Sequence, residues 1–233
     1  SFFSECVQKG TETVVLEATS HALSPEYDRL AGITFSGAIF TTLTHEHMEF
    51  HKTKEAYVEA KLMLARRLKP GAPLIVPYDN PYYRQILEAA PQACSLTTEV
   101  LEADQAFSSA DIHAVITARH PRSMEFTLTA DAPLQERDHS KASVSGRFST
   151  PFPFMLSNAV EALCMVHLLL GHPFGQLVPH MEKLTPARGR LQFVDNNLGA
   201  TILIDFAHTA DAFHHVMSAL RAAAPHASMT VVF

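Results

Sequence analysis

The sequence predicts an α/β protein built on a parallel sheet. Short apolar runs, which are typical of buried strands, occur at residues 14–16, 33–43 and 74–76. Residues 54–68 carry apolar side chains at helical spacing with charges between them, and residues 82–90 show a second helical pattern. Because strands and helices alternate along the chain, we expect βαβ units and a parallel sheet.

The pattern changes after residue 110, where antiparallel strands are predicted. Residues 111–118 and 124–128 are short alternating segments joined by polar turns. Residues 156–170 form a strong helical pattern that Gly171-His172-Pro173 ends, and residues 175–187 are expected to be irregular. The parallel sheet should therefore have a small antiparallel portion.

A second unit is expected after Pro186. It is predicted to contain two strands, a helix and a further strand, at residues 189–194, 200–204, 210–224 and 229–233. We therefore predict two domains, 1–186 and 187–233. The first ten residues look like a helix already in progress and the last five like a buried strand, so we expect a fragment of a longer protein.

Composition excludes several classes of protein. The formal net charge is −6 and neither half is basic, which argues against nucleic acid as a ligand. Three widely spaced cysteines exclude a disulfide scaffold and a zinc finger. The longest apolar stretch, 159–170, contains Glu161 and His167 and is too short to span a bilayer, and no signal peptide opens the chain. The sequence predicts a soluble cytoplasmic protein without a membrane partner.

Two polar clusters could carry chemistry in the first quarter of the chain. Glu17 to His21 follow a predicted strand, where a carboxylate could hold Mg²⁺; the alternative is a helix cap with an incidental Glu. His45, His47 and His51 lie in a dense His/Glu stretch, but their spacing matches neither a zincin nor a zinc finger. Without further information, an exposed polar loop explains that stretch best.

Two further positions have equally plain alternatives. Lys61 lies on the apolar face of a predicted helix, where it could extend its amine to water or be a buried amine that is chemically modified. Arg190 suits phosphate, and Asp205 at a strand end suits a ribose hydroxyl or a metal. The alternatives there are an exposed Arg and a helix N-cap at Thr209 or Asp211. No glycine precedes a lysine, so the sequence contains no phosphate loop.

Taken in order, these clusters resemble the Mur ligases. The resemblance rests on five segments that span nearly the whole chain. They are LEATSHAL (16–23), similar to E-V-S-S-H-G/A-L; FTTLTHEHMEFHKTKEAYVEAK (40–61), similar to F-T-N-L-x-x-D-H-L-D-Y-H-G-T-x-x-x-Y-x-x-A-K; FMLSNAVEAL (154–163), similar to F-N-x-x-N-x-x-A-A; ARGRLQFVDNN (187–197), similar to P-G-R-M-E; and ILIDFAHTADAFHHVMSAL (202–220), similar to V-V-D-Y-A-H-T-P-D-A-L. The sequence departs from these patterns at Met155, Phe206 and Ala210, and Pro77-Tyr78-Asp79 stands for N-A-D.

The resemblance implies a fold and an activity. The central domain would be a mononucleotide-binding domain of the phosphate-loop type, here without its loop, and residue 187 would begin a Rossmann-like domain. The branch that it implies adds a diamino acid, L-lysine or meso-diaminopimelate, to UDP-N-acetylmuramoyl-L-Ala-D-Glu through an acyl phosphate, with ATP as co-substrate. The intact enzyme would be a monomer, and the isolated chain should be inactive because its phosphate loop is missing.

The resemblance also implies roles for individual residues. The Mg²⁺ ligands would be Glu17, His47 and Lys61, with Lys61 carbamylated and so catalytic. Substrate-binding residues would be Thr19, Ser20 and Arg29, and ATP-binding residues would be Asn158, Arg190 and Asp205, with a catalytic His208 beside them.

Two alternatives stay open. A related ligase of the folylpolyglutamate synthase or cyanophycin synthetase type shares the metal-binding Glu, His and Lys. A Mur-like binding protein without catalysis would lack the phosphate loop altogether.

Overall fold

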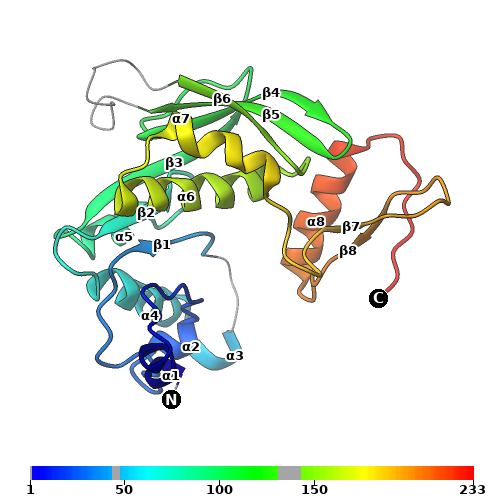
Figure 1. Ribbon diagram of the computed structural model, residues 1–233. Coiled ribbons are helices and arrows are strands. Elements are labelled where there is room, and N and C mark those ends of the chain that lie inside the picture. Colours follow the sequence, from blue (N-terminus) through cyan, green and yellow to red (C-terminus); the bar gives the residue numbers. More distant parts are fainter. Residues whose placement is uncertain (1, 44–47, 131–142) are drawn as a thin grey trace.

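A computed structural model describes residues 2–43, 48–130 and 143–233. Its centre is a six-stranded sheet in the order β1-β2-β3-β4-β5-β6 (Figure 1). The strands are β1 (Ala38–Ile39), β2 (Pro73–Pro77), β3 (Cys94–Glu102), β4 (Ile112–His120), β5 (Ser123–Ala130) and β6 (Ser143–Phe148). Neighbouring strands are parallel from β1 to β4 and antiparallel from β4 to β6. The predicted α/β fold with an antiparallel portion is confirmed.

The helices follow the predicted pattern closely. They are α1 (Phe2–Gln8), α2 (Ser20–Leu23), α3 (Met48–His51), α4 (Lys54–Arg66), α5 (Tyr83–Glu88), α6 (Pro153–Leu170), α7 (Phe174–Leu177), the 3-10 helix η2 (Val178–Lys183) and α8 (Ala210–Ala223). The predicted helices at 54–68, 82–90, 156–170 and 210–224 are confirmed. Thr53 caps α4, because its hydroxyl accepts a hydrogen bond from the amide of Ala56.

The fully buried strand β2 divides the core into two layers. Ile75 packs into the cluster beneath α6 and α7, whereas Leu74 and Val76 pack into the cluster beneath α4 and α5. This alternation follows from the two-residue period of a strand, and a strand buried on both faces reads as a continuous apolar run. The sequence 73–77 is such a run.

Helix α6 is the central helix of one layer. Pro153 opens it, and Gly171 ends it in the left-handed conformation, with φ of 71°. It is long and apolar enough to cross a membrane by length and composition alone. In this fold, however, Leu156, Val160 and Leu163 pack against the sheet, so α6 is a core helix.

Four local predictions were wrong. Residues 14–16 form no strand and Val15 is 94% exposed, because no strand among the described residues pairs with them. Residues 229–233 also form no strand and remain exposed. Only two residues of the run 33–43 form a strand, in β1. The segment 175–187, expected to be irregular, contains most of α7 and all of η2, whose Val178 and Met181 are buried.

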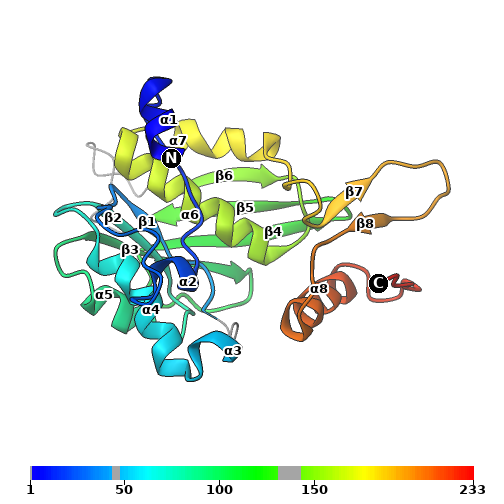
Figure 2. The ribbon, with the colours of Figure 1, turned by 90° about the horizontal axis from the view of Figure 1, so that it is seen from below.

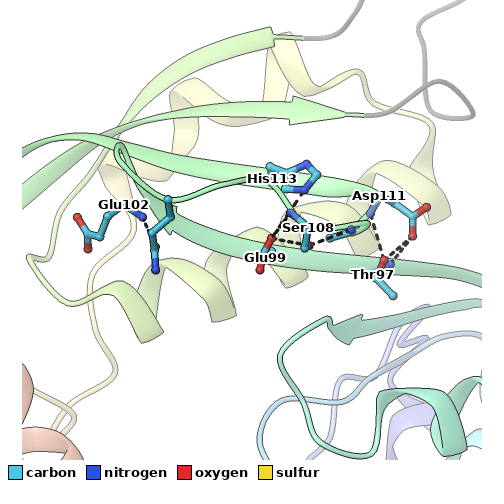
Figure 3. A network of polar contacts seen from close by, with 8 residues as sticks. Thr97, Glu99, Glu102, Ser108, Asp111 and His113 are labelled. Atoms are coloured by element: carbon cyan, nitrogen blue, oxygen red, sulfur yellow. Dashed lines mark hydrogen bonds and ion pairs between the residues drawn. The ribbon is translucent and has the colours of Figure 1, made fainter.

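A polar network aligns β3 with β4, where the sheet changes from parallel to antiparallel (Figure 3). The Asp111 carboxylate accepts hydrogen bonds from the amide and the hydroxyl of Thr97, both at 2.7 Å. Two residues further along β3, the Ser108 hydroxyl donates to Glu99 at 2.6 Å, and the buried His113 ring lies 3.7 Å from the same carboxylate. These contacts give Thr97 and Glu99 of β3 hydrogen-bond partners, so both polar residues can lie in an inner strand.

A small C-terminal unit lies beyond one end of the main sheet, as both ribbon views show (Figures 1 and 2). Its antiparallel strands β7 (Gln192–Val194) and β8 (Ile202–Ile204) precede α8. Its contacts with the main body include the Phe193 ring, which stacks 6.4 Å from that of Phe152 and lies 5.1 Å from the Arg122 guanidinium. Arg122 also donates to Asp195 at 3.1 Å. The hairpin therefore lies beside the start of α6.

We predict that Gly146→Ala destabilises the protein by about 1–3 kcal/mol through overpacking. A Cβ at this position of β6 would lie 2.4 Å from Val178 Cγ1 and 3.1 Å from the Phe126 ring, both of which are buried. Chemical denaturation measures the loss. Gly175→Ala is the matched control, since its Cβ would meet nothing within 4 Å. Equal stability of the two variants would contradict the packing of β6 against η2.

Candidate functional site

A cavity of about 400 Å³ opens at the carboxyl ends of β1 and β2. Thr41 and Thr42 follow β1, Asp79 and Asn80 follow β2, and the first turns of α6 form the opposite wall. Parallel α/β sheets bind ligands at this edge of the sheet, where loops from neighbouring strands meet. The cavity is therefore the candidate site of the main domain.

Asn80 joins the two loops that border the cavity. Its buried side-chain amide donates to the carbonyl oxygen of Thr41 at 3.0 Å and accepts from the amide of Tyr82 at 2.9 Å. Asn80 thus holds the two loops together with one donor and one acceptor of its side-chain amide.

Glu161 is the most unusual group in the cavity wall. It is 1% exposed, and its Oε1 accepts a hydrogen bond from the Ser157 hydroxyl at 3.0 Å. Its Oε2 is buried and has no hydrogen-bond partner among the described residues. Burial raises the pKa of the Glu161 carboxyl to about 7; the Ser157 hydroxyl opposes the shift and the charge of Asp79 adds to it.

A second buried oxygen lies in the same layer. The hydroxyl of Thr98 is fully buried and has no partner among the described residues. Thr98 pairs with Pro77 and stands two residues before Val100, and both of these residues line the cavity. Orphaned buried oxygens at a cavity are typical of a site that receives a polar ligand or ordered water.

The structure places Asn158 in the cavity. It lies on α6 beside Ser157 and is exposed into the open space. Phe154, Ser157, Asn158 and Glu161 follow helical spacing, so they share one face of the helix. The predicted nucleotide residue therefore lines the same cavity as the buried carboxyl.

Lys61 lies next to the segment that contains Glu17. The Lys61 Nζ donates to the carbonyl oxygen of Ala18 at 3.3 Å, which joins two motifs that are 43 residues apart. Glu17 is exposed, and His47, the third predicted ligand, lies outside the described residues. Within residues 2–43, 48–130 and 143–233, no three His, Cys, Asp or Glu side chains gather closely enough to hold a metal ion.

The predicted substrate residues have different surroundings. The Thr19 hydroxyl accepts a hydrogen bond from the amide of Ala22 at 3.2 Å, so Thr19 caps α2. A helix cap was the alternative interpretation of this segment. Ser20 is buried, and its hydroxyl has no partner among the described residues. Arg29 is exposed, with its guanidinium 5.9 Å from the centre of the Tyr27 ring. Of the three, Ser20 combines burial with a hydroxyl that has no hydrogen-bond partner among the described residues.

The C-terminal unit brings its three predicted residues together. The Arg190 guanidinium lies 4.9 Å from the centre of the Phe206 ring, and the His208 ring lies 4.9 Å from the same centre. Asp205 accepts from the amides of Leu191 and Ala207, both at 2.8 Å. Asp205 thereby fixes the loop that carries Arg190. Thr209 caps α8, because its hydroxyl accepts a hydrogen bond from the amide of Ala212. An N-cap at Thr209 or Asp211 was the alternative interpretation of this segment.

The described residues that are predicted to bind metal or ATP or to be catalytic thus fall into three groups: Asn158 at the cavity, Lys61 beside the segment of Glu17, and Arg190 with Asp205 and His208. The described lining of the cavity includes no residue from the C-terminal unit.

The sequence interpretation missed Ser157 and Asp79 as site residues, and it treated Glu161 only as a break in an apolar stretch. A lone carboxyl inside the apolar run 153–170 was the available signal, because an unpaired buried charge is costly and usually has a function.

The sequence profile of the Mur ligase middle domain matches residues 1–166. A UDP-N-acetylmuramyl-tripeptide synthetase from Roseiflexus sp. (strain RS-1) is 31% identical over 227 residues, which cover 93% of this chain and 42% of that protein. A UDP-N-acetylmuramoyl-L-alanyl-D-glutamate--2,6-diaminopimelate ligase from Mesorhizobium japonicum (strain LMG 29417 / CECT 9101 / MAFF 303099) is 32% identical over 219 residues, with 93% and 42% covered.

Among solved structures, the apo form of FPGS from L. casei shares the fold, with a TM-score of 0.67 and 16% identity. The match covers 94% of this chain and 49% of that one. The chain therefore spans less than half the length of these relatives.

We predict that Glu161→Gln stabilises the protein at pH 8 but changes little at pH 5. A carboxyl whose folded pKa is raised from 4.5 to about 7 makes the folded state lose stability as pH rises through this interval. The shift corresponds to about 3 kcal/mol. Denaturant unfolding of both proteins at the two pH values measures the difference. A difference that is the same at pH 5 and pH 8 would contradict the buried state of this carboxyl.

Proposed function

Because the chain belongs to the Mur ligase family, we propose that it is part of an ATP-dependent ligase that adds a diamino acid to UDP-N-acetylmuramoyl-L-Ala-D-Glu. The amine would be L-lysine or meso-diaminopimelate. Both curated relatives carry names of this branch, and together they support the substrate class. The domains would be the central ATPase domain (1–186) and the beginning of the C-terminal domain (187–233).

The contact between Lys61 and Ala18 is the structural observation that carries this proposal. It holds the lysine of one motif against the backbone beside the glutamate of another. Addition of the neutral amine to CO₂, with loss of one proton, would convert Lys61 into a carbamate. A cation that repels metal would then become an anion that attracts it. Glu17, His47 and the modified Lys61 would hold Mg²⁺, which when bound neutralises charge on the phosphates.

The reaction requires two anions, the phosphates of ATP and the D-glutamate carboxylate, to approach each other. ATP would transfer its terminal phosphoryl group to the D-glutamate carboxylate and release ADP. The amine of the diamino acid would then displace phosphate from the acyl phosphate and form the amide. Arg190, held beside Phe206, can donate two hydrogen bonds to phosphate oxygens, and Asp205 keeps its loop in place.

The deciding experiment measures ADP release by the full-length protein with the muramoyl dipeptide and each amine. Release that depends on both the dipeptide and one of the two amines supports the proposal. Release that depends on a folate and glutamate would support the alternative that the fold of L. casei FPGS raises. Binding of the dipeptide without ADP release would support a non-catalytic protein.

We predict that Lys61→Ala removes most of the activity of the full-length enzyme, and that acetate or formate restores part of it. The small carboxylate would occupy the space of the carbamate and supply the same charge. Steady-state rates with and without carboxylate measure the effect. Lys54→Ala is the control, because Lys54 is an exposed residue of the same helix. Full activity of Lys61→Ala would exclude the carbamate.

We also predict that Arg190→Lys lowers kcat/KM by 10- to 1000-fold, which is about 1.4–4 kcal/mol. Lysine keeps the charge but loses the planar fork that binds phosphate with two hydrogen bonds. The control is Arg188→Lys, two residues away and exposed. Equal kinetics of Arg190→Lys and wild type would remove Arg190 from the site.

A further inference from the structure

The described wall of the cavity beside α6 carries acidic side chains and no basic ones. Two carboxyl groups, from Asp79 and Glu161, belong to its wall, and none of the described lining side chains is Lys, Arg or His. The remaining described wall is largely apolar, with Phe154, Val100 and several prolines. Such a cavity repels phosphate and suits an apolar group that carries hydrogen-bond donors.

The polar wall is fixed by a hydrogen bond within α6. Ser157 donates its only hydroxyl hydrogen to Glu161, 3.0 Å away. A serine hydroxyl has one hydrogen and two lone pairs, so a serine that already donates can only accept from a ligand. Ser157 is partly exposed and lines the cavity, whereas Glu161 is buried behind it. Glu161 therefore determines which kind of group Ser157 can bind.

This arrangement is not part of the family pattern given above. In F-N-x-x-N-x-x-A-A, aligned with residues 154–162, alanine occupies the position of Glu161. A buried carboxyl with an orphaned oxygen is costly, so its presence at this position calls for a role beyond packing.

We propose that Glu161 is a positioning residue for nucleotide selection: it holds Ser157 as a hydrogen-bond acceptor, so the cavity prefers a purine base with an amino group to one with an oxo group. The amino group of adenine donates to Ser157, whereas the oxygen of hypoxanthine at the same position would face its lone pairs. This inference rests on the proposed function in one respect, namely that Asn158 and the cavity receive the nucleotide.

Binding of nucleosides tests the inference without phosphate chemistry. Titration of the protein with adenosine and with inosine at pH 8.5, followed by NMR, gives a ratio of dissociation constants. At this pH the Glu161 carboxyl is ionised and cannot donate. We expect wild type to prefer adenosine by about tenfold. Adenosine gains a hydrogen bond to Ser157, whereas the oxygen of inosine is left beside Ser157 without a donor.

A double-mutant cycle separates positioning from packing. Glu161→Ala should reduce the preference below about threefold, because Ser157 could then rotate and donate to inosine. Ser157→Ala should reduce it equally, and the double variant should show no further change. The exposed Glu88→Ala on α5 is the control and should keep the preference. Ser157→Ala alone still tests the inference if Glu161→Ala does not fold.

The outcomes separate the two proposals. Equal binding of adenosine and inosine by wild type, or a full preference in Glu161→Ala or Ser157→Ala, would overturn the inference. A weakening of both nucleosides by the same factor in Glu161→Ala would also overturn it, because that is the effect of a purely structural residue. A full-length enzyme that fails to release ADP while its adenosine preference persists would instead overturn the proposed function and leave the selection role of Glu161 in place.

Discussion

The division of α6 into two faces is the constraint on which the rest of the structure depends. Leu156, Val160 and Leu163 bury one face against the sheet, and the face with Ser157, Asn158 and Glu161 forms the wall of the cavity. A helix rotated by one residue would expose leucines and bury more polar groups in the core, at a cost of several kcal/mol. Packing of the core thus also sets the position of the polar side chains at the cavity.

The fold could be predicted where the local pattern and the final environment agree. Residues 73–77 are apolar throughout and lie between two layers, and the helical patterns match α4, α6 and α8. Strand β3 escaped prediction because Thr97, Thr98 and Glu99 interrupt its apolar residues. Thr97 and Glu99 form hydrogen bonds with Asp111 and Ser108, respectively, only in the folded chain (Figure 3). Local pattern cannot reveal such partners.

The candidate site could be predicted only in part, for a related physical reason. Motifs with fixed spacing led to the predictions for Lys61, Asn158 and Arg190, because each can be recognised from its neighbours in the chain. The behaviour of Glu161 depends instead on its burial in the cavity wall and on the charge of Asp79, which follows β2. A helical pattern shows that Glu161 interrupts an apolar segment, but the environment that raises its pKa exists only in the folded protein.

The distribution of charge explains why a nucleotide would need both units. A triphosphate requires cations, but the described wall of the cavity contains carboxyls and no basic side chain. Arg190 lies in the C-terminal unit, whose hairpin contacts the residue before α6 through Phe193 and Phe152. Under the proposed function, the base would occupy the cavity while Arg190 approaches the phosphates from the other unit.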